Sequence, residues 1–422
     1  MWAVIQIGAR EHYQIPKMMH RSGKLSVLIT DFWMPKWANK YYFGRVSGRR
    51  NEEIPDSMVV SYNFRTIIQI LRYSILKKSK WYSIIDFNEK FQNWVKKDIQ
   101  KILLNSKTEV KYVYIYSYSG STIIEVLKSN NYGVVLNQID PGIVEHEIIK
   151  KVYIKCGRPC AIPSIPEIYW LKWKKEVRKS DLIVVNSKWT HDCLVSIGIE
   201  SNKMRVLPLV YEKPSFHTNM MHKRFLSLGP TKFSRSKPMR VLFLGQVIIR
   251  KGIIPLIEAM KQMEEDPVIL DIVGEVKDIL PIETECVNNI VWHGPVTRDK
   301  ASMFYDSADI FILPTWSDGF GITQLEAMAH GVPVIASRFC GDVVRDGYNG
   351  LLLNRVSSAE IENTLRSLTV EPQRLSNMKK NSFETVIHHF SPNIWNEKLH
   401  TIERELEHIV QKRLSDPLGS KS

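Results

Sequence analysis

Short runs of apolar residues recur through the first half of the chain and predict buried strands. No charged residue interrupts them, and the stretches between them are long enough for crossover helices, such as the helix expected near Gln14 to Arg21. This alternation is typical of a parallel sheet. The predicted strands are Trp2 to Gly8, Ser26 to Thr30, Val113 to Tyr116, Gly133 to Asn137 and Leu182 to Asn186.

The same alternation restarts more clearly in the second half. Helices are expected at about 300–307 and 322–330, with others beginning near Ser358 and Glu371. The expected strands are Arg240 to Gly245, Val268 to Gly274, Ile290 to His293, Asp309 to Leu313, Val334 to Ala336 and Leu351 to Leu353. The chain is therefore expected to hold two doubly wound α/β units.

The boundary between the two units is expected where periodicity disappears. Residues 215–238 gather Ser, Lys, Gly and Pro without any repeating apolar pattern, which indicates a linker or long surface loop. We therefore expect a first Rossmann-like domain at 1–214 and a second at 239–390.

The end of the chain predicts one more helix, at about 392–412. Ser391 supplies an N-cap and Pro392 suits the first helical position. The helix is expected to pack back on the first domain through one apolar face. That face carries Trp395, Leu399, Ile402, Leu406 and Ile409.

Composition excludes several classes of protein. Of the 422 residues, 44% are hydrophobic and 24% are charged, which are values of ordinary globular proteins and not of disordered chains, fibres or coiled coils. The 58 basic and 44 acidic residues give a net charge of +14, which favours contact with phosphate, an acidic polymer or an anionic membrane surface.

Location and metal content also follow from the sequence. The first residues lack the basic start of a signal peptide, and no run reaches the ~18 apolar residues of a membrane span, so a cytoplasmic protein is expected. Five cysteines cannot all pair, which favours a reducing compartment. Cys156 and Cys160 have no second ligand pair nearby, so no metal site is expected.

Candidate chemistry concentrates in a strand, loop and helix at 309–337. Gly319, Phe320 and Gly321 make a tight turn in which glycines allow close backbone approach to an anion. The helix start at Gly321, Ile322 and Thr323 presents free N–H donors that suit a diphosphate. The preceding loop carries Asp318. The helix carries Glu326, whose carboxylate could accept both hydroxyls of a ribose.

This segment resembles the signature of retaining glycosyltransferases of family 4, also called group 1 glycosyltransferases. The family pattern is an acid, seven residues, a Glu, and then A-M-A-x-G-x-P-V-I-A-S. Asp318 stands here where the family usually has Glu, and Glu326 matches the second acid. The loop after the strand at 240–245 resembles the basic loop of the family, so Lys251 is implied to neutralise the donor diphosphate. Many members have Arg where this chain has Gln246, and Arg250 could supply the second charge.

The resemblance extends well from about residue 171 onward and only loosely before it. Gly8 and Arg10 occupy the first strand-to-helix loop, where the family brings acceptor and donor phosphate together. Arg10 and His12 could bind anionic groups there, or Arg10 and Glu11 could equally belong to a helix start. Many members place a His close to the sugar after a mid-domain strand. Gln138 or Asp140 holds that place here, and Asp140 or His146 could act as a base for the acceptor hydroxyl.

One further segment, at 170–179, allows two interpretations. Trp170, Trp173 and Val177 share one helical side, and five basic residues surround them. The stripe could rest on an anionic membrane surface. Alternatively, it could be the core face of a helix whose basic face is solvated.

The resemblance implies the GT-B fold, two facing Rossmann-like domains with a cleft between them. It implies an enzyme that transfers a sugar, with retention of configuration, from a nucleotide-diphosphate sugar to a hydroxyl of a glycan, lipid carrier or small molecule. Neither a metal nor another cofactor is expected. The alternatives are a GT-B epimerase or phosphorylase and a catalytically silent protein that binds glycan or nucleotide. Nucleic acid is not expected as a partner, because no recognisable binding motif is present.

Overall fold

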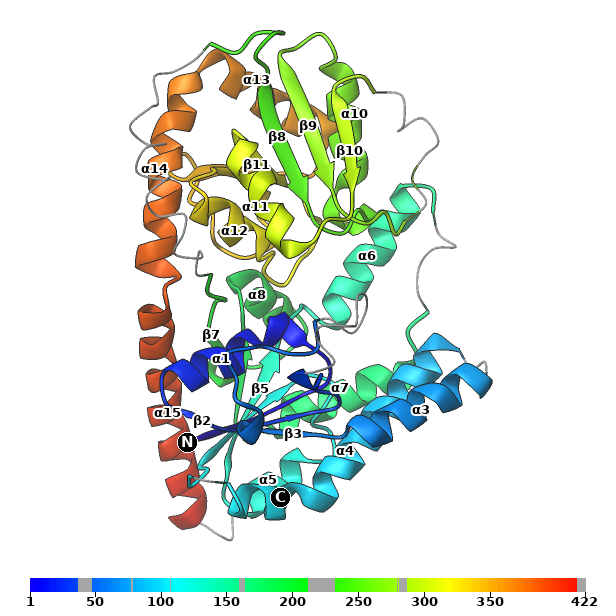
Figure 1. Ribbon diagram of the computed structural model, residues 1–422, viewed down its shortest axis with the longest axis vertical. Coiled ribbons are helices and arrows are strands. Elements are labelled where there is room, and N and C mark those ends of the chain that lie inside the picture. Colours follow the sequence, from blue (N-terminus) through cyan, green and yellow to red (C-terminus); the bar gives the residue numbers. More distant parts are fainter. Residues whose placement is uncertain are drawn as a thin grey trace.

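The computed structural model describes residues 1–36, 48–76, 79–106, 108–158, 164–211, 232–278, 280 and 287–415. Two separate parallel sheets with surrounding helices form two domains, stacked one above the other (Figure 1). This architecture confirms the expected pair of doubly wound α/β units.

The first domain is built on a seven-stranded sheet of order β3-β2-β1-β4-β5-β6-β7. Its paired strands are all parallel. The strands are β1 Trp2–Gln6, β2 Leu25–Thr30, β3 Val59–Ser61, β4 Tyr112–Tyr116, β5 Gly133–Gln138, β6 Leu182–Val185 and β7 Met204–Val206. The helices are α1 Gln14–Arg21, α3 Asn63–Leu76, α4 Lys80–Leu104, α5 Ile124–Ser129, α6 Ile143–Lys155, α7 Glu167–Lys179 and α8 Lys188–Ser196.

The second domain repeats the design with six parallel strands in the order β10-β9-β8-β11-β12-β13. The strands are β8 Met239–Leu244, β9 Val268–Val273, β10 Ile290–Gly294, β11 Ile310–Leu313, β12 Val334–Ser337 and β13 Gly350–Leu353. The helices are α10 Ile253–Gln262, α11 Arg298–Ser307, α12 Thr323–Ala329, α13 Ser358–Val370 and α14 Pro372–His389, followed by α15 Pro392–Ser415.

Burial on both faces explains why the strands read as continuous apolar runs. Alternate residues of β1 point to opposite sides of the sheet, so Trp2 and Val4 join one core cluster while Ala3 and Ile5 join another. All five residues of β1 are buried.

Helix α15 returns the chain to the first domain. Its residues Trp395, Leu399, Ile402 and Leu406 belong to the same core cluster as Trp2. Trp2 also donates its indole N–H to Glu403 at 2.7 Å. In Figure 1 the orange α14 lies beside the second domain and the red α15 continues downward along the first.

Some elements differ from the sequence expectation. The first strand ends at Gln6 instead of Gly8, because the chain turns at Gly8, whose φ is +80°. The expected linker lies outside the described residues as far as residue 231, and a short bridge joins Ser234 to Lys237 beyond it. The pattern did not predict β3, α3, α4 or β7.

The two interpretations of segment 170–179 are separated by the structure. Trp170, Trp173 and Val177 of α7 pack in a core cluster with Leu136 of β5. The apolar stripe is therefore a core face, and the suggestion that this stripe rests on a membrane is wrong.

Three of the five cysteines lie in the described part of the chain. Cys156, Cys193 and Cys340 are free thiols, whereas Cys160 and Cys286 lie outside the described residues. Within the described ranges, no cluster of three or more His, Cys, Asp or Glu side chains could hold a metal ion. The described helices include none with the length and apolarity to cross a membrane.

Candidate active site

A cleft of about 360 Å³ lies between the two domains, at the carboxyl ends of the parallel strands. Ligands of open α/β sheets bind at this edge, where the strand order reverses. The first domain contributes the loops after β1, β5 and β6, and the second contributes those after β8 and β11. The lining includes Glu11, His12, Gln14, Lys17, Asn51, Ile139, Asn186, Gly245, Lys251, Asp318, Phe320, Gly321, Ile322, Thr323 and Glu326.

Lys251 and Asp318, both chosen from the sequence, meet in this cleft. The Lys251 ammonium forms an ion pair and hydrogen bond with Oδ2 of Asp318, and Arg250 Nη1 lies 3.6 Å from the same oxygen. Burial raises the pKa of Asp318, but the two cations outweigh it and lower the value to about 2. Asp318 is therefore a carboxylate at any physiological pH.

The backbone holds Arg250 and Lys251 in place at the turn Ile249–Lys251. The Arg250 carbonyl accepts from the Trp316 N–H at 2.9 Å and from the Thr315 hydroxyl at 3.1 Å. Gly252 then starts α10 at φ +75°, and a Cβ there would lie 1.9 Å from the Pro314 carbonyl oxygen. Close contact between the loops after β8 and β11 thus requires glycine at this position.

The turn at Gly319, Phe320 and Gly321 packs directly against the first domain. A Cβ on Gly319 would lie 1.9 Å from the carbonyl oxygen of Ile139. The Ser187 hydroxyl, at the start of α8, donates to the Gly319 carbonyl at 2.5 Å. Gly321 adopts φ +71°, which favours glycine.

Helix α12 begins at Thr323, directly after this turn, and carries Glu326 in its first turn. The hydroxyl of Tyr305, on α11, donates to Glu326 Oε2 at 2.8 Å and orients the carboxylate. Glu326 and Asp318 both line the cleft. The backbone at Gly321, Ile322 and Thr323 lies between them in the sequence and lines the cleft too.

Glu145, on α6 of the first domain, joins the same charge cluster and was not identified from the sequence. Its Oε1 lies 3.2 Å from Arg250 Nη1 and accepts from the Ser317 hydroxyl at 3.0 Å. Burial raises the pKa of Glu145 to about 7, although Arg250 acts in the opposite direction. The pairing depends on how the domains pack, so no local motif could have revealed it.

The loop after β1, expected at the site from the sequence, has a backbone conformation that the sequence did not reveal. Glu11, His12 and Tyr13 have φ values of 48°, 53° and 61°, three consecutive left-handed residues that are not glycine. Such strain persists where surrounding contacts fix it, and it is common at functional sites. Tyr116 donates to Glu11 at 2.8 Å, while burial raises the pKa of Glu11 to about 7.

Besides Arg250 and Gly319, four predicted site residues lie outside the cleft lining. The Gly8 N–H donates to Asp31 at 2.8 Å, so Gly8 supports the loop. Arg10, Gln246 and Asp140 do not line the cleft either, and Gln246 is exposed.

The three candidates for the missing His occupy different positions. Gln138 is fully buried, accepts from Trp173 at 2.8 Å and donates to Asp140 Oδ1 at 3.0 Å, so it supports Asp140 from within the core. Asp140 also accepts from the Tyr118 hydroxyl at 3.4 Å. The His146 ring lies against Trp170 with centroids 6.0 Å apart, and burial lowers its pKa.

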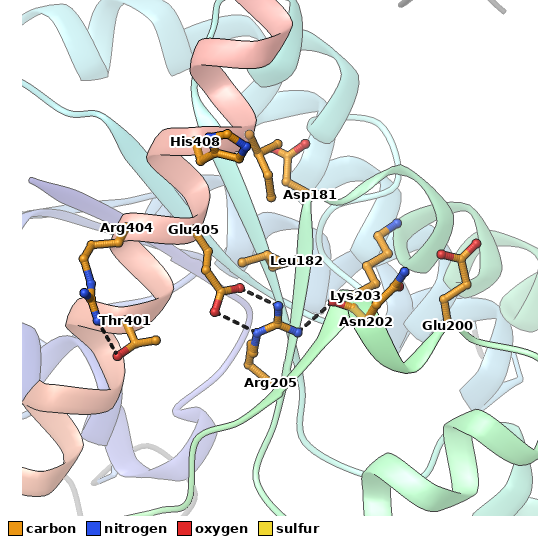
Figure 2. A pocket seen from close by; sticks show the side chains of 11 residues that line it. Asp181, Leu182, Glu200, Asn202, Lys203, Arg205, Thr401, Arg404, Glu405 and His408 are labelled. Atoms are coloured by element: carbon orange, nitrogen blue, oxygen red, sulfur yellow. Dashed lines mark hydrogen bonds and ion pairs between the residues drawn. The ribbon is translucent and has the colours of Figure 1, made fainter.

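A larger hollow of about 630 Å³ lies elsewhere, between α15 and the edge of the first sheet (Figure 2). Two ion pairs at this hollow attach α15 to the sheet: Arg205 on β7 donates to Glu405 on α15 at 3.0 Å, and Asp181 pairs with Arg413 of α15 at 2.5 Å. This hollow therefore marks the attachment of α15, and the interdomain cleft remains the candidate active site.

The second domain matches a known protein family. Residues 230–385 match the family described as glycosyl transferases group 1. An uncharacterized 41.2 kDa protein in the cps region of Klebsiella pneumoniae is 27% identical over 268 residues, which are 59% of this chain and 72% of the relative.

Solved structures resemble the fold over nearly the whole chain. Sucrose-phosphate synthase from Thermosynechococcus elongatus superposes with a TM-score of 0.64 at 16% identity, over 97% of this chain and 99% of the other. HepE of Anabaena, in complex with UDP-glucose, gives a TM-score of 0.58 at 13% identity, over 96% and 99%. The fold is thus GT-B. The second domain matches the group 1 glycosyltransferases, so the chain carries a glycosyltransferase domain.

Proposed function

We propose that the protein transfers a sugar from a nucleotide-diphosphate donor to a hydroxyl acceptor, with retention of anomeric configuration. The observation that carries this proposal is the convergence of Lys251, Asp318 and Glu326 in one interdomain cleft. HepE, which shares the fold, is described in complex with UDP-glucose, and this supports a nucleotide sugar as donor.

In the proposed reaction, the donor diphosphate lies against Lys251 and the backbone N–H groups at Gly321, Ile322 and Thr323. Arg250, whose Nη1 lies 3.6 Å from Oδ2 of Asp318, adds a second positive charge beside Lys251. As the sugar leaves, negative charge grows on the diphosphate, and fixed donors in a cleft that excludes water stabilise it. The donor is a substrate, and the proposal includes neither a metal nor another cofactor.

The two acids receive different partners in this proposal. Glu326, on the helix after the turn, binds the ribose hydroxyls, and Tyr305 orients it. Asp318, before the turn, contacts the transferred sugar and shares Lys251 with the diphosphate. Asp140 is proposed as the base for the acceptor hydroxyl, at the first-domain side of the charge cluster.

The acceptor is proposed to be a glycan or lipid-linked hydroxyl, and the protein is proposed to work in the cytoplasm, peripherally at the inner membrane face. The net charge of +14 supports an anionic surface as partner. A catalytically silent binding protein is the second candidate. It is motivated by Asp318 in place of the usual Glu and by Gln138 in the region where the family has a His.

A donor screen tests the proposal. The protein is incubated with mixed nucleotide sugars and a lipid or glycan acceptor fraction, and mass spectrometry follows donor loss, free nucleotide and product. The expected result is release of one nucleotide diphosphate together with a product heavier by one sugar. Binding of a nucleotide sugar without turnover would favour the silent protein, and a donor converted to its epimer would favour the epimerase.

A further inference from the structure

Helix α3 of the first domain is amphipathic in the reverse sense of an ordinary surface helix. Its buried residues are the polar Thr66 and Gln69. Phe64 is 77% exposed and Ile75 is 79% exposed. Its exposed large apolar residues are Phe64, Ile67, Ile68, Ile70, Leu71, Ile75 and Leu76. A surface helix normally buries such residues and exposes polar ones.

Hydrogen bonds fix this orientation. The Thr66 hydroxyl donates to the carbonyl of Asp31, in the loop after β2, at 2.8 Å. The Tyr73 hydroxyl donates to Asp86 on α4 at 2.6 Å, and the Gln69 amide donates to the same carboxylate at 3.4 Å. The polar side of α3 is therefore the attached side, and its apolar residues face outward as a consequence.

Exposing these apolar side chains to water costs free energy, which a partner that covers them would recover. A contiguous apolar patch larger than a few hundred Å² is rare on monomeric soluble proteins and marks a protein or membrane interaction site. In Figure 1, α3 lies on the outer flank of the first domain, beside α4 and away from the second domain. The patch is thus separate from the cleft and from the pairing of the two domains.

The charged residues around the apolar face of α3 indicate what kind of partner it binds. Residues 63–82 contain no acidic residue. In the described part of this stretch, Arg72 lies on α3, Lys80 begins α4, and Tyr82 is 46% exposed. Arg65, also on α3, pairs with Asp98 of α4 at 3.8 Å. Cationic residues around an exposed apolar helix face, with an aromatic residue nearby, are the features of helices that lie in the interface of an anionic bilayer.

We propose that α3 is an interfacial helix that docks the first domain on an anionic lipid surface. Its apolar residues would enter the boundary between headgroups and acyl chains, while Arg72 and Lys80 would meet lipid phosphates. Because α3 is bonded to the loop after β2, docking would hold that domain at a fixed distance from the bilayer. The proposal does not depend on the transfer reaction, since binding is measured without substrates.

Flotation with vesicles tests it on the full chain. Wild-type protein is mixed with vesicles of phosphatidylcholine alone or with phosphatidylglycerol added. It is compared with an Ile67→Asp/Ile75→Asp variant. Val370→Asp is the matched control, because Val370 is 80% exposed on α13 of the second domain. We expect wild type and control to float with anionic vesicles, and the α3 variant to lose binding by about tenfold or more.

Circular dichroism establishes that the variants are folded, and sedimentation velocity measures self-association. A wild-type protein that fails to bind anionic vesicles would overturn the proposal, as would equal binding to neutral vesicles or an α3 variant that binds normally. A dimer that the α3 variant abolishes, without vesicle binding, would assign the patch to a second copy of the chain instead. None of these outcomes depends on whether the chain transfers a sugar.

Discussion

Four charged side chains form one connected cluster at the cleft, and their signs alternate. Glu145 contacts Arg250 at 3.2 Å, Arg250 lies 3.6 Å from Asp318, and Asp318 pairs with Lys251. Each charge is largely buried and is neutralised by a neighbour. Removal of Lys251 or Arg250 would leave the buried Asp318 carboxylate with one cation instead of two, which costs more than the lost contact.

Lys251 tests the electrostatic part of the proposed reaction. Lys251→Ala should lower kcat/KM about 30-fold or more, because a charge-assisted contact to the developing diphosphate charge is worth at least ~2 kcal/mol. Steady-state kinetics would measure this loss of kcat/KM, on a variant whose unfolding curve matches that of the wild type. Lys277→Ala, whose side chain is 43% exposed, is the control. Turnover close to that of the control would remove Lys251 from the site.

Glu326 tests the position of the ribose. Glu326→Ala should raise the donor dissociation constant, whereas Glu326→Gln should lose less because one acceptor oxygen remains. Tyr305→Phe removes only the orienting hydrogen bond, so a smaller loss is expected. Calorimetry with the nucleotide diphosphate gives the three constants. Unchanged affinity in both Glu326 variants would leave Glu326 as an acid of the helix surface.

The sequence could indicate Asp318 and Glu326 because they flank a Gly-Phe-Gly turn between a predicted strand and a predicted helix. Lys251 was indicated by the resemblance of its loop to the basic loop of the family. Glu145 could not be found in this way, since it reaches Arg250 from the other domain. The position of Glu11 in the cleft depends on a left-handed backbone conformation, which no pattern of residue types predicts.

Among elements, the turn after β11 sets how closely the domains can approach. Gly319→Ala would place a Cβ 1.9 Å from the Ile139 carbonyl oxygen, so the two loops must separate. We expect kcat/KM to fall between about tenfold and a hundredfold, as misplacement of reacting groups by about 1 Å can produce. Kinetics beside Gly48→Ala, where no atom lies within 4 Å, checks this. Equal activity of the two variants would show that the contact is dispensable.

Helix α15 should stabilise the first domain chiefly through its buried face. Leu399 is fully buried beside Trp2, so Leu399→Ala should cost about 2–5 kcal/mol of the free energy of unfolding. Leu414, on the same helix, is 55% exposed, and Leu414→Ala should cost less than about 0.5 kcal/mol. Urea unfolding measures both. Similar losses in the two variants would contradict the packing described for α15.

Periodicity predicted many of the elements whose apolar residues face a core, although it missed α4, which buries Phe91, Val95, Ile99 and Leu103. The helix at Gln14–Arg21 begins and ends where expected, and most strands differ from expectation by one or two residues. Helix α3 was missed, and its apolar residues face outward, the reverse of the usual pattern. β3 has only three residues, too few for an alternating pattern to be read.

At the scale of the whole molecule, three buried carboxyl groups should make the protein less stable as pH rises from about 4.5 to 7. Burial raises the pKa of Glu11, Glu145 and Glu176 to about 7. Between about pH 4.5 and 7 the folded chain therefore holds protons that the unfolded chain has released. The free energy of unfolding must fall as pH rises through this window.

Substitution of Glu145 measures how much of this pH dependence arises at the contact between the domains. Glu145→Gln keeps a neutral side chain beside Arg250, so the slope of unfolding free energy between pH 5 and 7 should become about one third less steep. Asp140 and Asp318, which also act on Glu145, stay in place. Urea unfolding at several pH values gives the slope, and Glu371→Gln is the control because that side chain is 60% exposed. At pH 8 the Glu145 variant should unfold at higher urea than wild type. A slope unchanged from wild type would show that Glu145 ionises at an ordinary pH and that its burial between the domains has no effect on its charge.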